Sequence, residues 1–198
     1  MSDELRIERL YGAAIAQQLP GIAQLRIQVF REFPYLYEGS EDYERKYLQT
    51  YIDSPDSLFV LVFDGERLVG ASSGLPLSDE VDDLRRPFEQ QGEPVERIFY
   101  CGESVLLPEY RGRGIGVRFF EEREAHARRL GRFEKICFCA VERPADHPRR
   151  PADYLPLDGF WQRRGYQKRS DLRTTFVWQD LDETAESPKP MVFWMKSL

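Results

Sequence analysis

The pattern of apolar and polar positions in the first third of the chain predicts one strand, two helices and a β-hairpin. Residues 5–10 alternate in polarity, as a half-buried strand does. Two further segments carry apolar residues at helical spacing. A proline stands at the start of the first of these predicted helices, and a serine caps the second. A continuous apolar run, an Asp-Gly turn and a second run are typical of an antiparallel hairpin. The predicted elements are strands over 5–10, 58–63 and 67–72, a helix from Pro20 towards Phe33, and a helix after Ser40 whose buried side carries Tyr43, Tyr47, Leu48 and Tyr51.

The rest of the chain predicts a β-α-β crossover, a long loop, a short helix and two last strands. A polar insertion over 78–97 precedes the crossover and carries a short helix. Four prolines exclude a long helix from residues 143–156. We expect an acidic loop containing Pro188 and Pro190 between the last two strands. The predicted elements are strands over 98–107, 135–141, 174–178 and 191–195, and helices over 81–90, 117–130 and 157–164.

A glycine-rich turn, R-G-R-G-I-G over 111–116, separates the crossover strand from its helix. Glycine lets backbone N–H groups converge on one anion, and a helix N-terminus adds further free N–H groups. No Lys-Ser/Thr pair follows, which excludes a Walker-type loop, and the spacing does not fit G-x-G-x-x-G. The spacing that remains is R-x-x-G-x-G, formed by Arg111, Gly114 and Gly116. It indicates a phosphate site, and an ordinary turn is the alternative.

These segments together resemble the GCN5-related N-acetyltransferase (GNAT) superfamily, whose pyrophosphate motif is Q/R-x-x-G-x-G/A. The segment F-W-Q-R-R-G-Y over 160–166 is similar to that family's F-Y-x-x-x-G-F, and the closing M-V-F-W-M-K-S-L is similar to its last strand. The resemblance covers nearly the whole chain. It implies an α/β (α+β) fold with a central mixed, mostly antiparallel sheet of about seven strands flanked by helices. It also implies a single domain over 1–198, with the insertion 78–97 and the proline-rich loop 143–156.

The resemblance further implies that acetyl-CoA is the co-substrate and that an amine attacks it directly in a ternary complex. The strand end would pair with the pantetheine arm and the thioester through Val105, Leu106 and Leu107. The turn would hold the pyrophosphate through Arg111, Gly112, Arg113, Gly114, Ile115 and Gly116. The side chains of Arg111 and Arg113 could add charge, and plain solvent exposure is the alternative for Arg113.

Two residues are candidates for proton transfer. Glu103 places a carboxylate inside the predicted crossover strand, where an unused charge is costly, so we expect it to be the general base. A Glu that is ion-paired to a neighbouring element is the alternative. The resemblance would place a tyrosine as general acid at position 161, but this chain has Trp161, which carries no titratable proton. Tyr154 could replace it, or solvent could protonate the thiolate.

The acceptor site implied by the resemblance lies between the first two helices and the later loops. Tyr35 and Tyr37 could line a pocket there, and Glu38 could attract an ammonium group; aromatic packing between the helices is the alternative. The acidic cluster formed by Asp79, Glu80, Asp82 and Asp83 is expected to be a solvated face. If it folds over the site, it would favour a cationic amine.

Composition narrows the class of protein further. The formal net charge is −6, which argues against a general nucleic-acid binder. No apolar run approaches the roughly 20 residues of a membrane span, and residues 1–5 do not resemble a signal peptide. Cys101, Cys137 and Cys139 are an odd number of thiols, which we expect to be reduced in the cytoplasm. With two histidines in the chain, we expect no metal site.

The function predicted from the sequence is therefore transfer of an acetyl group from acetyl-CoA to a primary amine of a small molecule or a peptide. The alternative is a catalytically silent protein that binds acyl-CoA as a sensor or scaffold. Pairing of the last strands would permit a homodimer.

Overall fold

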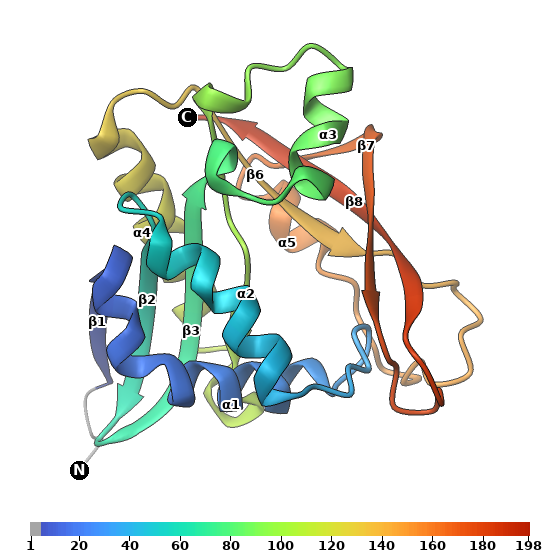
Figure 1. Ribbon diagram of the computed structural model, residues 1–198. Helices are drawn as coiled ribbons and strands as arrows, with labels where there is room; N and C mark the ends of the chain where they lie inside the picture. Colours follow the sequence, from blue (N-terminus) through green and yellow to red (C-terminus); the bar gives the residue numbers. More distant parts are fainter. Residues whose placement is uncertain (1–4) are drawn as a thin grey trace.

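A mixed eight-stranded sheet forms the centre of the computed structural model, which describes residues 5–198 (Figure 1). Seven strands follow the order β1-β2-β3-β4-β6-β8-β7, and β5 pairs with β3 beside β4. The pairing is antiparallel except between β4 and β6. This is the predicted mixed, mostly antiparallel sheet. The strands are β1 (Arg6–Tyr11), β2 (Leu58–Asp64), β3 (Arg67–Pro76), β4 (Ile98–Tyr100), β5 (Ser104–Leu106), β6 (Lys135–Val141), β7 (Gln167–Trp178) and β8 (Ser187–Ser197).

Helices cover both faces of the sheet. In Figure 1, α1 and α2 cross in front of β2 and β3, while α4 runs behind them. The Ser40 side chain accepts a hydrogen bond from the Tyr43 N–H and caps α2, as its position predicts. None of the helices within residues 5–198 is both long and apolar enough to cross a membrane. The α-helices are α1 (Leu19–Phe30), α2 (Glu41–Asp53), α3 (Asp82–Gln90), α4 (Ile115–Leu130) and α5 (Asp158–Gln162).

The crossover strand predicted over 98–107 is instead two short strands, β4 and β5, separated by residues 101–103. β4 pairs with β3 on one side and with β6 on the other, whereas β5 pairs with β3. The apolar run gave no sign of this interruption. It arises because β6 runs alongside β4 and then diverges from β5, a tertiary feature that local sequence does not contain.

The last hairpin is longer than predicted, and its prolines lie inside a strand rather than in a loop. Pro188 is opposite Val177 and Pro190 is opposite Thr175 in the β7–β8 ladder. The β6–β8 ladder begins at Met191, and the Pro190 carbonyl accepts from the Glu142 N–H just beyond β6, so the nitrogens of both prolines face away from β7. Because proline lacks an N–H only on the side of β8 that faces away from β7, the hydrogen bonds between β7 and β8 are kept, and proline is tolerated there.

The start of the chain is described from residue 5. The acidic segment Met1–Glu4, on which the expectation of no export signal partly rests, lies outside the described residues.

Candidate active site

The sheet opens at residues 101–103. The Cys101 N–H donates to the Cys137 carbonyl at 2.8 Å, which continues the β4–β6 ladder by one bond. Beyond it, the Ser73 N–H donates to the Glu103 carbonyl and the Leu107 N–H donates to the Val69 carbonyl, both at 3.0 Å. Because hydrogen-bonding directions alternate along a strand, the N–H and C=O groups of residues 104 and 106 face away from β3, towards the opening.

The glycine turn lies between β5 and α4. Gly112 and Gly114 have φ angles of 76° and 81°, which favour glycine. A Cβ atom added to either would meet nothing within 4 Å, so the space in front of the turn is open. α4 begins at Ile115, two residues earlier than predicted, and its N-cap Gly114 makes no side-chain cap. The first N–H groups of the helix therefore face this space, as an anion site requires.

The two arginines of the turn make local contacts. The Arg111 guanidinium forms an ion pair with Glu32 at 2.8 Å and donates from Nε and Nη2 to the Leu106 carbonyl at 3.1 and 3.0 Å. Arg111 thus covers an outward-facing carbonyl of β5. Arg113 donates to the Glu109 carbonyl at 2.8 Å and lies over the Tyr110 ring. Both side chains are exposed.

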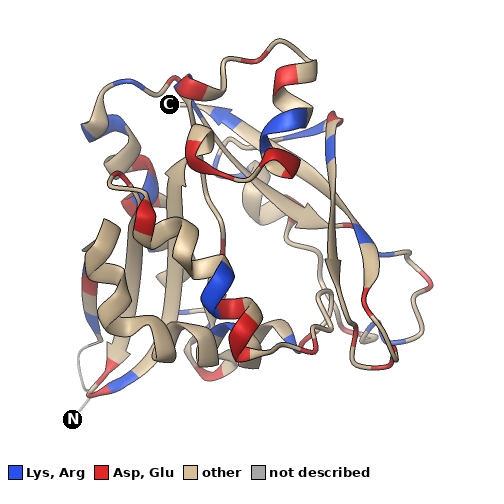
Figure 2. Cartoon of the chain, viewed as in Figure 1, with Lys and Arg blue, Asp and Glu red and all other residues tan. Residues whose placement is uncertain are grey.

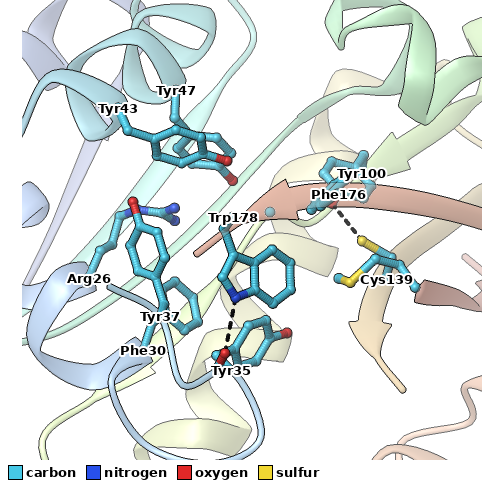
Figure 3. Close-up of a pocket in the computed structure, with 12 residues that line it drawn as sticks. Arg26, Phe30, Tyr35, Tyr37, Tyr43, Tyr47, Tyr100, Cys139, Phe176 and Trp178 are labelled. Carbon is cyan, nitrogen blue, oxygen red and sulfur yellow. Dashed lines mark hydrogen bonds between the residues drawn. The ribbon is translucent and has the colours of Figure 1, made fainter. Parts of the chain in front are cut away.

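An aromatic cavity of about 60 Å³ lies where β4 and β6 begin to diverge (Figure 3). Tyr100 and Gly102 line it from one side of the divergence and Cys139 from the other. The Tyr100 hydroxyl lies 3.2 Å from the Cys139 sulfur. Side chains from α1, the α1–α2 connection, α2 and β7 complete the walls. They are Arg26, Phe30, Tyr35, Tyr37, Tyr43, Tyr47, Phe176 and Trp178, with Met191 from β8.

A buried ion-pair network lies against this cavity. Arg26 of α1 is 5% exposed and joins two carboxylates: its Nη1 lies 2.7 Å from Glu103 Oε2, and its Nε bonds to Glu44. The Tyr37 hydroxyl donates to Glu44 Oε1 at 3.0 Å, and the Tyr47 hydroxyl donates to Glu103 Oε2 at 2.8 Å. Buried charges persist when they are paired and hydrogen-bonded, and each of these three charges is paired.

Glu103 lies in the break between β4 and β5 rather than inside a strand, and its side chain is ion-paired, which was the alternative considered for it. Burial raises the pKa of its carboxyl, while Arg26 and Tyr47 oppose this shift. Its second oxygen, Oε1, is buried without a hydrogen-bond partner among residues 5–198. The residues that line the cavity include Arg26 and Tyr47, and Glu103 lies behind them.

The predicted acceptor residues separate into two groups. Tyr35 and Tyr37 both line the cavity, and Tyr35 stacks on Trp178 with ring centroids 5.9 Å apart. Glu38 instead points away: its side chain is 44% exposed and bonds to Arg31 at 3.1 Å.

Tyr154, the candidate general acid, and Trp161, which stands where the resemblance places a tyrosine, both lie outside the cavity lining. Tyr154 packs edge-on against Phe33, with ring centroids 4.7 Å apart, and burial raises the pKa of its phenol. Trp161 packs against Phe138 and Trp194 at 5.0 and 5.1 Å.

Sequence reasoning missed the catalytic potential of Tyr47 and Arg26. The helical spacing predicted only that Tyr47 lies on a buried face. It predicted no role for Arg26, a single charged residue within an apolar helix. The spacing of Tyr47 and Tyr51, one turn apart, was visible, but their polar partners come from distant segments. Tyr43, assigned to the same buried face, is 38% exposed at the rim.

The acidic cluster of the insertion is only partly a solvated face. Asp82 and Asp83 are exposed, at the start of α3 where Figure 2 shows acidic positions in red. Glu80, in contrast, is 6% exposed and faces the protein interior. The Tyr51 hydroxyl donates to Glu80 Oε1 at 3.4 Å, and the Val81 N–H donates to Oε2 at 3.2 Å. The expectation of a solvated face is wrong for Glu80 because the insertion folds back against α2.

The chain thus combines an opened β-α-β crossover, a glycine turn at a helix N-terminus and an aromatic cavity at the break between β4 and β5. The model of the Acetyltransferase (GNAT) family matches residues 22–152. The chain belongs to this family, whose reaction is acetyl-CoA-dependent acetyl transfer.

Solved structures with the same fold cover almost the whole chain. Ribosomal-protein-alanine N-acetyltransferase from Brucella melitensis is 14% identical, with a TM-score of 0.61 over 98% of this chain and 99% of that one. NAA60 from Arabidopsis thaliana, solved with acetyl-CoA, is 12% identical, with a TM-score of 0.63 and the same coverage. An N-acetyltransferase from Staphylococcus aureus Mu50 is 11% identical, with a TM-score of 0.62 over 98% of each chain. A search among curated proteins finds no match.

Proposed function

We propose that this protein transfers an acetyl group from acetyl-CoA to a primary amine held in the aromatic cavity. One observation carries the proposal: the open edge of β5 and the cavity meet at the break over 101–103. Gly102 lines the cavity, and β5 begins two residues later. A thioester placed along the open edge would therefore adjoin an amine in the cavity.

The residues present fit the co-substrate. The outward N–H and C=O groups of Ser104 and the outward N–H of Leu106 suit an amide-containing arm, and the open space at Gly112 and Gly114 suits a pyrophosphate. Bound acetyl-CoA would supply an activated acyl carbon. The parts of the chain proposed to hold it are the strand end, Val105, Leu106 and Leu107, and the turn from Arg111 to Gly116.

The acceptor must lose a proton to become a nucleophile, and Tyr47 is the hydroxyl that both lines the cavity and bonds to Glu103. We place the proton transfer there. Tyr47 takes the amine proton as it passes its own proton to Glu103 Oε2. The neutral amine nitrogen then forms a C–N bond with the acyl carbon. As the C–S bond breaks to leave a thiolate, the nitrogen releases its second proton to solvent and becomes an amide. Glu103 is thus the base and acts through Tyr47.

The aromatic walls support an acceptor that carries an apolar or aromatic group beside its amine. Tyr35, Tyr37, Phe176 and Trp178 offer flat faces, and the buried network contains two carboxylates for one arginine. The leaving thiolate can take a proton from solvent or from Tyr154 if the proline-rich loop moves toward the cavity. Comparing Tyr154→Phe with the unchanged protein distinguishes these two sources.

A thiol-release assay tests the proposal. Purified protein is incubated with acetyl-CoA and a panel of arylalkyl amines, polyamines, amino acids and peptides. We expect turnover with some of these amines. We expect Glu103→Gln to lower kcat about 10²-fold while CoA binding by calorimetry is retained, because the amide keeps the shape but accepts no proton. Glu66→Gln, in the exposed β2–β3 turn, is the matched control and should change nothing.

A silent acyl-CoA-binding protein is the second candidate, and Trp161 favours it because tryptophan cannot act as an acid. This candidate predicts CoA binding without thiol release for any amine in the panel. Absence of CoA binding would contradict both.

A further inference from the structure

A chain of hydrogen bonds connects Glu103 to a second buried carboxylate, Glu80. Tyr47 and Tyr51 lie one turn apart on α2, and their hydroxyls are 3.0 Å apart. Tyr47 donates to Glu103 Oε2 at 2.8 Å, and Tyr51 lies 3.4 Å from Glu80 Oε1. Two hydroxyls therefore bridge two carboxylates, and the Tyr47 end lines the cavity.

The two carboxylates differ in the free energy of binding a proton. Glu103 is paired with Arg26, so protonating it would discharge one side of a buried ion pair. Among the ion pairs of residues 5–198, none includes Glu80. A buried carboxyl without a cation favours its neutral form.

The groups that face Glu80 reinforce this difference. Burial raises the pKa of Glu80 to about 7, its hydrogen bonds oppose the shift, and nearby acidic groups add to it. A base with this pKa is well matched to neutral solution. The titratable groups around it are Tyr51 on α2, Asp79 beside it, Glu103, Tyr100 on β4, and Cys137 and Cys139 on β6.

We propose that Glu80 is the final proton acceptor of this chain and returns Glu103 to its charged, ion-paired state after each proton transfer. The proposal rests on the proposed function. The Glu103 proton passes to the Tyr47 oxygen, the Tyr47 proton to the Tyr51 oxygen, and the Tyr51 proton to Glu80 Oε1. Each hydroxyl gains one proton and loses one, so Glu103 ends as a carboxylate and Glu80 as a neutral acid. Glu80, which is 6% exposed, then releases the proton to solvent before the next turnover. Glu80 is a positioning residue because it acts through the tyrosines.

Infrared titration tests the resting position of the proton without any acceptor. The free protein is titrated from acidic to alkaline pH, and the band of a buried protonated carboxyl is followed. We expect a band that disappears near neutral pH, is absent in Glu80→Gln and persists in Glu103→Gln. The neighbouring Asp79→Asn variant is the control and should keep it. Loss of the band in Glu103→Gln and its persistence in Glu80→Gln would overturn the proposal.

Kinetics test the route once an amine from the panel gives thiol release. Glu80→Gln and Tyr51→Phe should each lower kcat about 10-fold and change the pH at which kcat/KM rises, with CoA affinity unchanged. Calorimetry with CoA checks that both variants are folded. An unchanged pH profile in both would refute the route. If no amine reacts, the proposed function fails, and the infrared titration still decides where the proton resides.

Discussion

The candidate site has two halves, the glycine turn and the network beside the cavity, and they use different chemical groups: backbone amides in the first and side chains in the second. The glycine turn over 111–116 is exposed and presents backbone N–H groups, and the open space in front of it depends on two positive φ angles. The network beside the cavity is buried and consists of side chains from α1, α2 and the break, held by ion pairs and hydroxyls. Substitution should therefore affect the two halves differently: the turn through ligand affinity, and the network through stability and proton transfer.

The largest effect is expected from Arg26→Met. The variant leaves Glu44 and Glu103 buried without their shared cation, which should lower the free energy of unfolding by about 3–5 kcal/mol. Urea denaturation measures this loss. Arg31→Met is the matched control because Arg31, at the end of the same helix, makes an exposed ion pair with Glu38. It should change stability by less than about 1 kcal/mol. Equal losses would mean that the buried network is not a structural unit.

A pH-dependent effect of similar size is expected from Glu80. Its pKa is about 7 in the folded protein against an ordinary 4.5, so the folded state binds the proton more tightly. This stabilisation is complete below pH 4.5 and is lost as pH rises through 7. Glu80→Gln stays neutral, so it should exceed the unchanged protein in stability by up to about 3 kcal/mol above pH 8, and match it near pH 4. Thermal denaturation across this range measures the difference, and Asp79→Asn should show none of it.

The difference between the exposed turn and the buried network also explains which parts of the site could be predicted from the sequence. The turn lies on consecutive residues, so its spacing alone indicated a phosphate site, and the order of elements indicated the fold. Glu103 was a candidate because a lone carboxylate stood in an apolar run. Its partners Arg26 and Tyr47 are far from it in sequence, and helical spacing describes only that such residues face inward. The break at 101–103 and the burial of Glu80 depend on how β6 and the insertion pack, which no local pattern encodes.

A smaller effect, chiefly on ligand affinity, is expected at the turn. Gly114→Ala forces alanine into a φ of 81° at the helix N-cap, where the displaced N–H groups would face the ligand less well. CoA affinity measured by calorimetry should fall about 10-fold. Gly65→Ala imposes a similar strain, at a φ of 57°, in the β2–β3 turn, where added atoms also meet open space. It should lose comparable stability and keep its CoA affinity; a parallel loss of affinity would mean that general destabilisation explains both.

The smallest effect is expected from Arg111→Gln, which separates backbone from side-chain recognition within the turn. Arg111 is exposed and engaged with Glu32 and the Leu106 carbonyl. An exposed ion pair contributes at most about 1 kcal/mol, so CoA affinity should fall less than 5-fold, and less than in Gly114→Ala. Arg113→Gln, whose guanidinium bonds to the Glu109 carbonyl, is the companion variant. A larger loss of CoA affinity for Arg111→Gln than for Gly114→Ala would show that side-chain charge contributes more to CoA binding at the turn than the backbone does. Both halves of the site would then act through side chains.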